Sequence, residues 1–382
     1  MKVALVHDYI KEYGGAERVL EALHEIYPDA TVFTSVYLPS YLGPHRARFA
    51  GWKIKTTFLQ WLPFKAKLIS PMRLLAPLAF KQLNFDGYDL IIVSATGSYF
   101  PNRINTRSAS LGQEKKALQI CYCHTPPRYL YGYATAREWK RHWWFRLLGE
   151  IANHFLRMID YNASKNVDFY IANSKEVAGR IEKFYRRDST VIYPPVDVNS
   201  KFEIRNSKLG KRDFFLAGGR LARPKRIDLA VEACTQLGLP LKVFGKEFAG
   251  YGEELRKMAG PSVEFVGEIT DIEKYNLMHN AKAFIFPAEE EDFGITPVEV
   301  MAAGTPVIAY RSGGVVETII DGKTGILFDD YSVNGLVSAI KRFNDLNHLI
   351  KSEDCVKQAQ KFSKERFKKE ILEFVEKRIR KR

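Results

Sequence analysis

Twelve short runs of apolar and β-branched residues recur along the chain, most of them separated by stretches with helical periodicity. The first six runs are residues 2–7, 31–36, 89–95, 117–124, 167–174 and 189–197. The second six are residues 213–221, 239–245, 262–268, 281–288, 305–310 and 324–330. Strands with such nearly unbroken apolar runs are buried on both faces, which is typical of parallel sheets covered by helices. The pattern predicts an α/β chain with two doubly wound parallel sheets in tandem.

The length of the chain supports two domains. Its 382 residues exceed what one core of ordinary size covers. Pro194 and Pro195 stiffen the chain between the two series of runs. We expect a first domain over residues 1–196, a second over 197–364, and a terminal helix over 365–382 with six apolar residues at helical spacing. These six residues are Phe367, Ile371, Leu372, Phe374, Val375 and Ile379.

The formal charge of +14 is concentrated in the N-terminal half of the chain. Residues 1–195 hold 27 Lys and Arg against 16 Asp and Glu, and no acidic residue lies between Asp29 and Asp86. This stretch interleaves cations with aromatic and leucine side chains, which predicts a surface for an anionic membrane or an anionic acceptor. The cations proposed to form it are Arg46, Lys53, Lys55, Lys65, Lys67 and Arg73. A solvated basic face is the alternative, and nucleic acid is not expected because no recognised binding motif accompanies the charge.

Targeting signals and cysteines restrict the compartment. No run of 18 apolar residues is present, so no transmembrane helix is expected, and the N-terminus lacks the pattern of a signal peptide. The four cysteines show no C-x-x-C spacing, so we expect neither a zinc site nor a redox site. We expect a cytoplasmic protein associated peripherally with the inner face of the cell membrane.

Ligands of open parallel sheets bind beyond the carboxyl ends of the strands, so the loops there are candidate sites. The run at 213–221 contains Gly218 and Gly219, followed by Arg220 and, five residues further on, Lys225. An Arg fork and a Lys beside a tight glycine turn are suited to a diphosphate. Neutralising its charge would also help a nucleoside diphosphate to depart. Surface cations that are only solvated are the alternative.

A second loop follows the run at 281–288 and is the richest in candidate residues. Four acids, Glu289 to Asp292, come directly after this run, and Glu299 follows in the first turn of an expected helix. The residues at the start of that helix are Phe293, Gly294, Ile295, Thr296 and Pro297, with Pro297 as its predicted first residue. The N–H groups of Gly294, Ile295 and Thr296 would point at a bound ligand. The acids could instead bind a metal ion, but a mere acidic turn leaves Gly294 and Glu299 unexplained.

The first domain offers two weaker candidates. Gly14 and Gly15 lie between the first run and a helix expected near Glu17, where backbone N–H groups could approach an anion or a hydroxyl. A plain turn is the alternative. His124 ends the fourth run, with a structural histidine as the alternative. The G-x-G-x-x-G fingerprint is absent, which argues against a dehydrogenase.

Together these segments resemble family 4, or group 1, of the retaining glycosyltransferases. That family has the GT-B fold: two doubly wound Rossmann-like domains with a C-terminal helix that crosses back to the first. The segment GGRLARPKRIDLAVEA at 218–233 is similar to the family's G-R-L-x-x-x-K element. Residues 291–328 are similar to its two Glu separated by seven residues and to its A-x-G-x-P-V and G-G-x-x-E segments.

The resemblance implies a role for each matching residue. Arg220 and Lys225 would bind the donor diphosphate, Glu299 the ribose hydroxyls, and Glu291 the hexose hydroxyls together with the backbone of 293–295. The catalytic residues would be His124, Arg220, Lys225 and Glu291. The donor-binding residues would be Gly15, Gly219, Arg220, Lys225, Phe293, Gly294, Ile295, Thr296 and Glu299. No metal and no other cofactor are implied, because cations and helix starts supply the positive field.

Within the family, residues 7–23 and 123–133 look like mannosyltransferases of O-antigen and capsule assembly. This implies GDP-mannose as the donor and a glycan or lipid-linked glycan as the acceptor. Front-face attack would retain the configuration, with a phosphate oxygen taking the acceptor's proton; covalent catalysis by Glu291 is the rival mechanism. Three alternatives stay open: another donor such as UDP-glucose or dTDP-rhamnose, a sugar-nucleotide epimerase, and a non-catalytic basic protein that binds membrane or nucleic acid.

Overall fold

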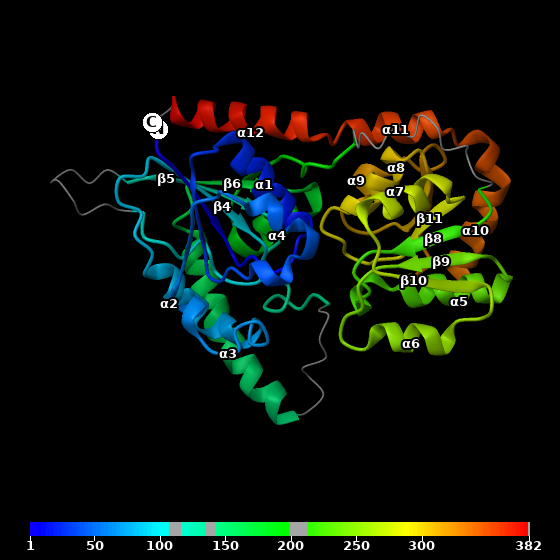
Figure 1. Ribbon diagram of the computed structural model, residues 1–382, viewed down its shortest axis with the longest axis horizontal. Helices are drawn as coiled ribbons and strands as arrows, with labels where there is room; N and C mark the ends of the chain where they lie inside the picture. Colours follow the sequence, from blue (N-terminus) through cyan, green and yellow to red (C-terminus); the bar gives the residue numbers. More distant parts are fainter. Residues whose placement is uncertain (107–115, 135–142, 199–211, 381–382) are drawn as a thin grey trace. The chain divides into compact units, whose positions relative to one another are not determined.

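The computed structural model describes residues 1–106, 116–134, 143–198 and 212–380, which form two compact units (Figure 1). Unit 1 takes the described residues up to Pro195 and those from Phe367 onward, and unit 2 takes Val196–Arg366. Each unit is built on one parallel sheet. The predicted α/β fold of two doubly wound parallel sheets is therefore confirmed.

The sheet of unit 1 has seven strands in the order β3-β2-β1-β4-β5-β6-β7, all paired in parallel. The strands are β1 (Val3–His7), β2 (Thr31–Thr34), β3 (Ile54–Thr56), β4 (Leu90–Ala95), β5 (Leu118–Cys123), β6 (Phe169–Ala172) and β7 (Ser189–Val191). Along β1, Ala4 and Val6 enter one apolar core while Val3 and Leu5 enter another. Both faces of the sheet are thus covered, which explains the unbroken apolar runs.

The helices of unit 1 divide between these two cores. They are α1 (Gly15–Ile26), α2 (Ala76–Lys81), α3 (Trp143–Ser164), α4 (Lys175–Tyr185) and α12 (Lys364–Ile379). Helices α1 and α12 cover one face, whereas α2, α3 and α4 cover the other. Four short 3₁₀ helices lie between β2 and α2, namely η1 (Pro39–Tyr41), η2 (Gly43–Phe49), η3 (Phe58–Trp61) and η4 (Pro71–Leu74). Among the described residues, no helix combines the length and apolar character needed to cross a membrane.

The sheet of unit 2 has six strands in the order β10-β9-β8-β11-β12-β13, again all parallel. The strands are β8 (Phe215–Gly218), β9 (Leu241–Phe244), β10 (Val263–Gly267), β11 (Ala283–Phe286), β12 (Val307–Tyr310) and β13 (Gly325–Phe328). The helices are α5 (Ile227–Leu237), α6 (Tyr251–Met258), α7 (Asp271–Asn280), α8 (Ile295–Ala302), α9 (Val315–Thr318), α10 (Val333–Leu346) and α11 (Ser352–Gln360). Two 3₁₀ helices, η6 (Arg223–Lys225) and η7 (Asn347–Leu349), complete the unit.

The strand order fixes where ligands can bind in each unit. The direction in which successive strands are added reverses between β1 and β4 in unit 1 and between β8 and β11 in unit 2. At such a switch point the loops that follow the two neighbouring strands leave in opposite directions and open a crevice at the carboxyl edge of the sheet. The loops singled out from the sequence follow β1, β8 and β11, three of these four strands, or β5, which lies next to β4.

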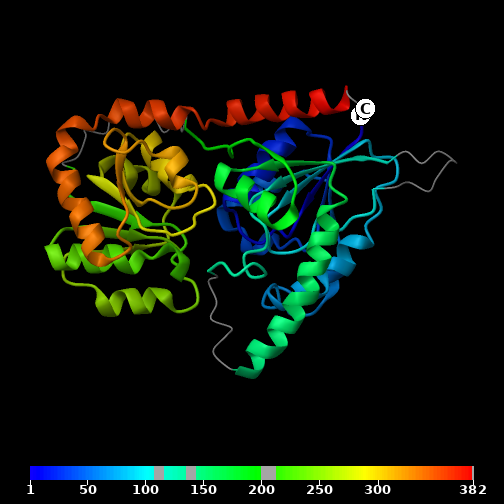
Figure 2. The same cartoon turned by 180° about the vertical axis from the view of Figure 1, so that it is seen from behind.

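The terminal helix α12 returns to unit 1, as predicted, and lies beside α1 (Figure 2). The Phe367 ring meets the Tyr122 ring edge to face, with centroids 5.7 Å apart, and Lys368 pairs with Glu25 of α1. The buried apolar residues are Phe367, Ile371, Phe374 and Val375. Leu372 and Ile379 are each 40% exposed, so the stripe is narrower than predicted. A helix that packs on a sheet with no further layer outside it can bury only the face that it turns toward the sheet.

We predict that Phe367→Ala lowers the free energy of unfolding of unit 1 by about 3–5 kcal/mol, because it empties a fully buried aromatic site. Urea unfolding monitored by circular dichroism measures this change. The matched control is Leu372→Ala on the exposed side of the same helix, for which we expect a change within about 0.5 kcal/mol. Equal effects of the two substitutions would contradict the packing of α12 on unit 1.

Candidate active site

In unit 2 a glycine turn carries the predicted cations away from the end of β8. Gly219 has φ +118°, a conformation that side chains rarely adopt, and a Cβ on Gly218 would lie 2.3 Å from the Phe244 carbonyl oxygen. Only glycine therefore fits this turn against β9. The chain then leads through exposed Arg220 into η6, which ends at Lys225. The Lys225 ammonium lies 5.4 Å above the ring of Phe286, the last residue of β11.

The acidic loop after β11 is supported from behind by a second glycine turn. A Cβ on Gly313 would lie 2.3 Å from the Glu291 carbonyl oxygen, and one on Gly314 would lie 2.5 Å from the Phe293 Cα. The Gly314 N–H donates to the Glu291 carbonyl oxygen at 2.7 Å. The two glycines of the G-G-x-x-E segment thus let the backbone of 312–314 press directly against the acidic loop. This close contact fixes where the Glu291 side chain begins.

The two loops meet through an ion pair between Lys225 and Glu291. The Lys225 Nζ lies 2.6 Å from Glu291 Oε2, although the residues are 66 positions apart. The side chains are 29% and 21% exposed. An ion pair this open to water contributes at most about 1 kcal/mol, so a bound ligand can replace either partner at little cost. The structure thus brings together Lys225, which was predicted to bind the diphosphate, and Glu291, which was predicted to bind the hexose.

Glu299 also has a lysine partner, which sequence reasoning missed. The Lys274 Nζ lies 3.2 and 3.3 Å from the two carboxylate oxygens of Glu299. Lys274 belongs to α7, whose start is fixed by a reciprocal capping box between Thr270 and Glu273. Lys274 lies outside every loop that follows a strand, so no local motif signals it. Its ammonium holds the Glu299 carboxylate in one orientation.

The start of α8 differs from the prediction. The helix begins at Ile295 with Gly294 as its N-cap, so Pro297 is its third residue and not its first. The N–H groups of a first helical turn have no partner within the helix, so proline is tolerated at this position too. Glu299 consequently lies in the second turn. The N–H groups of Ile295 and Thr296 still belong to the first turn, where an anion or a hydroxyl is favoured.

Gly294 and Phe293 shape the backbone that enters α8. Gly294 has φ +89°, and a Cβ there would approach Val315 Cγ1 to 3.0 Å. The Phe293 side chain is buried, with its ring centroid 5.4 Å from that of Phe362. The loop that would hold a sugar is therefore anchored by a buried aromatic ring at one residue and by a glycine at the next.

In unit 1, His124 belongs to a chain of polar side chains from three neighbouring strands. Its Nε2 lies 2.9 Å from the Ser94 hydroxyl oxygen at the end of β4, and that oxygen lies 3.1 Å from His7 Nδ1 at the end of β1. Burial and the neighbouring His7 lower the pKa of His124 to about 3. The imidazole is therefore neutral at neutral pH and can exchange hydrogen bonds with a ligand but cannot supply a positive charge.

The glycine loop after β1 is tied to the same chain of groups. Helix α1 begins at Gly15, two residues before the predicted start, with Gly14 as its N-cap. The Gly14 N–H donates to Glu17 Oε2 at 2.9 Å, and the other carboxylate oxygen of Glu17 lies 3.6 Å from His7 Nε2. Glu17 therefore links the Gly14–Gly15 loop to the histidines, which leaves the position of the loop well determined.

Asp8 is a second residue that sequence reasoning missed. Its carboxylate accepts the N–H of Thr96 at 2.5 Å and the N–H of Tyr99 at 3.2 Å. It therefore joins the loops that follow β1 and β4, the two strands at the switch point of unit 1. Burial raises the pKa of Asp8. Its partners lie 88 and 91 residues away, so only the fold reveals this role.

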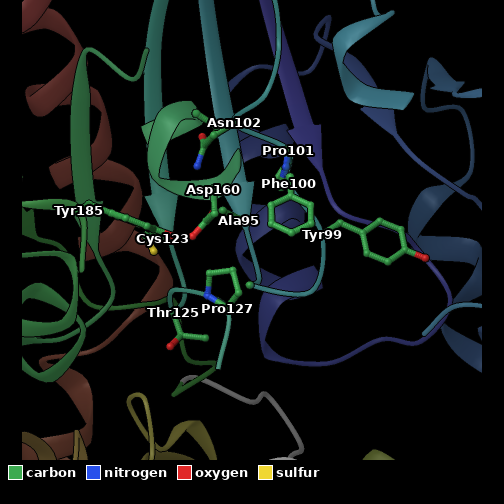
Figure 3. A pocket seen from close by; sticks show the side chains of 12 residues that line it. Ala95, Tyr99, Phe100, Pro101, Asn102, Cys123, Thr125, Pro127, Asp160 and Tyr185 are labelled. Carbon is green, nitrogen blue, oxygen red and sulfur yellow. Dashed lines mark hydrogen bonds between the residues drawn. The ribbon is translucent and has the colours of Figure 1, made fainter. Parts of the chain in front are cut away.

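A pocket lies at the carboxyl ends of β4 and β5, close to His124 (Figure 3). The residues that line it include Ala95, Tyr99, Cys123, Thr125, Asp160 and Tyr185. Asp160 accepts the hydroxyl hydrogens of Tyr131 and Tyr185, both at 2.9 Å. Burial raises the pKa of Asp160 to about 7, although these two hydrogen bonds act in the opposite direction. The pocket thus contains a carboxyl group that titrates near neutral pH.

The basic residues predicted for the acceptor or the membrane are spread over unit 1. Arg46, Lys53, Lys55 and Lys67 are exposed, whereas Lys65 and Arg73 are half-buried. The Arg73 guanidinium lies 4.2 Å above the Tyr129 ring, so its charge is held against the protein by a cation–π contact. Arg46, Lys53 and Lys67 remain available to an external anion, and Lys55 is also exposed although its ammonium lies 5.7 Å from the centroid of the Phe33 ring.

The acidic loop after β11 was the candidate for a metal site. Within the described ranges, no group of three or more His, Cys, Asp or Glu side chains is arranged to hold a metal ion. The run Glu289 to Asp292 lies within these ranges. Within this run, Glu291 pairs with Lys225.

Two family models match consecutive parts of the chain. Residues 13–200 match the family described as Glycosyltransferase Family 4. Residues 199–362 match the family described as Glycosyl transferases group 1. Together the two matches run from residue 13 to residue 362.

Similar proteins are found among both sequences and structures. The alpha-1,3/1,6-mannosyltransferase ALG2 of Mus musculus is 25% identical, over 96% of this chain and 94% of that protein. The Homo sapiens ALG2 is 27% identical, over 70% and 69%. Sucrose-phosphate synthase from Thermosynechococcus elongatus superposes over 100% of both chains with a TM-score of 0.74 and 19% identity. Anabaena HepE in complex with UDP and glucose superposes over 98% of this chain and 99% of that one, with a TM-score of 0.66 and 20% identity.

We predict that Asp160→Asn flattens the pH dependence of stability. The unfolded carboxyl ionises near its ordinary pKa of 3.8, while the folded one keeps its proton up to about pH 7. Between these values the unfolded state binds fewer protons, so the free energy of unfolding falls as the pH rises, and it levels off above 7. Urea unfolding at a series of pH values measures the slope. Asp345→Asn, at an exposed position of α10, should leave the slope unchanged; an unchanged slope in Asp160→Asn would contradict the prediction.

Proposed function

The chain belongs to the family 4, or group 1, glycosyltransferases and has their GT-B fold, and we propose that it transfers mannose from GDP-mannose to a glycan or lipid-linked glycan. The α-mannosyltransferase activity named for the ALG2 relatives supports mannose as the hexose. The observation that carries the proposal is the contact between Lys225 and Glu291 across the switch point of unit 2. It joins a cation suited to phosphate and a carboxylate suited to sugar hydroxyls within one crevice.

We assign the donor to unit 2. Arg220 and Lys225 bind the diphosphate, because both follow the strand β8 at its carboxyl edge and both are cationic. Glu299, oriented by Lys274, accepts hydrogen bonds from the ribose hydroxyls. Glu291 and the N–H groups at the start of α8 hold the hexose hydroxyls. In this assignment Arg220, Lys225 and the helix start provide the positive charge, so transfer proceeds without a metal ion.

Donor binding exchanges partners within the ion pair. Lys225 pairs with Glu291 in the structure, with its Nζ 2.6 Å from Oε2. When the diphosphate arrives, its oxygens take the Lys225 ammonium, and Glu291 turns to the hydroxyls of the hexose. The exposed pair costs at most about 1 kcal/mol to separate. The diphosphate as a whole carries more negative charge than one carboxylate and can also bind Arg220, so the exchange favours the complex.

We propose that the transfer retains configuration by front-face attack. The bond between the anomeric carbon and the diphosphate oxygen breaks, and the acceptor oxygen attacks from the same side of the sugar. A phosphate oxygen takes the proton of the acceptor hydroxyl, so Arg220 and Lys225 stabilise the charge that develops on the leaving group. The resemblance assigns Glu291 to the hexose hydroxyls and not to the anomeric carbon, and this assignment disfavours the covalent mechanism. The neutral His124 serves as a hydrogen-bonding group for the sugar.

We assign the acceptor to unit 1. A glycan carried on a membrane lipid would be reached by a cytoplasmic protein bound peripherally to the inner face of the cell membrane. The exposed cations of residues 46–67 are suited to anionic headgroups or to the phosphate of a lipid carrier.

We predict that Lys225→Ala lowers turnover by about 100-fold or more, because it removes one cation from the departing diphosphate. The assay measures GDP release from GDP-mannose with and without a lipid-linked glycan acceptor. Lys242→Ala is the matched control, since Lys242 of β9 forms a similar ion pair with Glu264, and we expect its turnover to be unchanged. Wild-type turnover in Lys225→Ala would refute the assignment. Consumption of the donor without acceptor, with formation of an isomeric sugar nucleotide, would indicate an epimerase.

We also predict that Glu299→Gln weakens donor binding by about tenfold, because an amide accepts the ribose hydroxyls less strongly than a carboxylate. Thermal shift with GDP, UDP, ADP and dTDP sugars measures the binding, and GDP-mannose should raise the melting temperature of the wild type most. In Glu299→Gln this rise should shrink, while Glu264→Gln should retain it. If another sugar nucleotide raised the melting temperature more than GDP-mannose does, the donor would be that sugar nucleotide and not GDP-mannose.

A further inference from the structure

Exposed apolar side chains are concentrated in two segments of unit 1. Of the twenty large apolar side chains exposed among the described residues, twelve lie in residues 58–78 or on α3 between 147 and 158. The first group is Phe58, Trp61, Phe64, Leu68, Leu74, Leu75 and Leu78, and the second is Leu147, Leu148, Ile151, Phe155 and Met158. Trp61 is 84% exposed and Phe64 76%. Clusters of apolar side chains on a protein surface that faces water mark an interaction site.

The two segments belong to one region of unit 1. Phe80 of α2 and Leu156 of α3 enter the same apolar core, and Figure 1 shows the two helices next to each other. The loop that precedes α3 touches both segments. Arg73 of η4 stacks on Tyr129, and Arg157 of α3 donates to the Leu130 carbonyl oxygen at 3.0 Å. Both segments are therefore packed on the same apolar core, which covers one face of the sheet of unit 1.

The apolar residues of α3 form a single stripe. Residues 147, 151, 155 and 158 are spaced by four, four and three positions, and residue 148 lies three positions before 151 and seven before 155, which places all five along one face of a helix. Leu156, Asp160 and Ala163 of the same helix are buried, so the exposed stripe is a second apolar face. A helix on the surface of a monomer needs only one such face. The second face indicates a partner that buries it.

The backbone conformation of Phe64 also indicates that its exposed ring has a function in binding a partner. Phe64 has φ +53°, the left-handed region that bulky side chains avoid. Glycine or asparagine would fit this turn with less strain, and the ring gains little from packing because it is 76% exposed. A large aromatic side chain is thus kept in a conformation that costs free energy, at a position where it can meet a partner.

The charge around these side chains selects the kind of partner. The first segment lies within the stretch from Asp29 to Asp86 that has no acidic residue, and it carries Lys65, Lys67 and Arg73. On the exposed part of α3, Glu150 is the one carboxylate between residues 147 and 158. Apolar side chains next to cations and few acids match the acyl boundary and the headgroups of an anionic bilayer.

We propose that residues 58–78 and the outer stripe of α3 form a membrane-insertion face that enters the headgroup–acyl boundary of an anionic lipid bilayer. The inference rests on the proposed function only in that it names the surface that would bring the enzyme to a lipid-linked acceptor. The aromatic and aliphatic side chains supply the affinity, and the lysines restrict binding to anionic lipid. Insertion depth is that of an interfacial helix, with the sheet of unit 1 outside the bilayer.

The test uses the full chain and vesicles of phosphatidylglycerol mixed with phosphatidylcholine, in a flotation assay. Leu148→Glu combined with Phe155→Glu should lower the partition coefficient about tenfold or more, because it places two anions on the insertion stripe. The matched control, Ile272→Glu together with Leu349→Glu, changes two apolar side chains of unit 2 that are 55% and 57% exposed, and should bind as the wild type does. Equal losses in both double variants would overturn the proposal.

Phe64→Gly separates membrane binding from folding. Glycine relieves the left-handed backbone, so stability should be unchanged or higher while vesicle binding falls severalfold. Bromine-labelled lipids should quench tryptophan fluorescence in the wild type, with less quenching in Trp61→Ser. Binding that high salt abolishes completely, with no quenching, would show electrostatic adsorption and overturn insertion.

Two further outcomes would also overturn the proposal. If the protein ignores vesicles and light scattering shows a dimer that Leu148→Glu dissociates, the face binds a second copy. If neither vesicles nor self-association depend on these residues, the face serves a protein partner. Thermal shift by GDP-mannose, which the variants should retain, keeps the two proposals apart. A wild type that shows the thermal shift but does not bind vesicles refutes the insertion face alone, whereas a wild type that binds vesicles without any shift refutes the proposed donor alone.

Discussion

The contact between the loops that follow β8 and β11 is the constraint on which the candidate site of unit 2 depends. The two strands are neighbours in the sheet, and the reversal of strand order between them sends their loops in opposite directions from one edge. Glycine turns make both loops possible: Gly218 and Gly219 against β9, Gly313 and Gly314 against the acidic loop. Side chains at these four positions would collide with backbone or strain it, so the loops could not approach. The functional groups are few, but close backbone contacts at Gly218, Gly313 and Gly314 and the positive φ of Gly219 fix the loops that position them.

Weak ion pairs are suited to a site that must bind and release its ligand. Lys225 pairs with Glu291, Lys274 pairs with Glu299, and all four side chains are partly open to water. Such pairs hold their charges in place and separate at low cost when a diphosphate or a sugar hydroxyl arrives. Unit 1 uses a different principle. His124 is half-buried and neutral, and it is oriented by a hydrogen bond with Ser94 and through Ser94 by His7.

The sequence predicts the central strands well because both faces of each sheet are buried and leave unbroken apolar runs. It misses β3, a three-residue edge strand with the exposed Lys55 at its centre, which has no such run. It also places the start of α8 two residues late, because proline is tolerated throughout the first helical turn. Lys274 and Asp8 escape notice for another reason: their partners are 25 and about 90 residues away, and only the fold brings them together. The roles of the residues that match the family's motifs follow from the resemblance. The pairing of Lys225 with Glu291 and of Lys274 with Glu299 is seen only in the structure.

A crystal structure of the chain with a bound nucleoside diphosphate tests the central claim most directly. We expect both phosphates in the crevice between the loops after β8 and β11, within hydrogen-bonding distance of Arg220 and Lys225. Lys225 should then have left Glu291, whose carboxylate would face the position of the sugar. A diphosphate bound elsewhere, with the Lys225–Glu291 pair still intact at its present 2.6 Å, would contradict the assignment of the donor site.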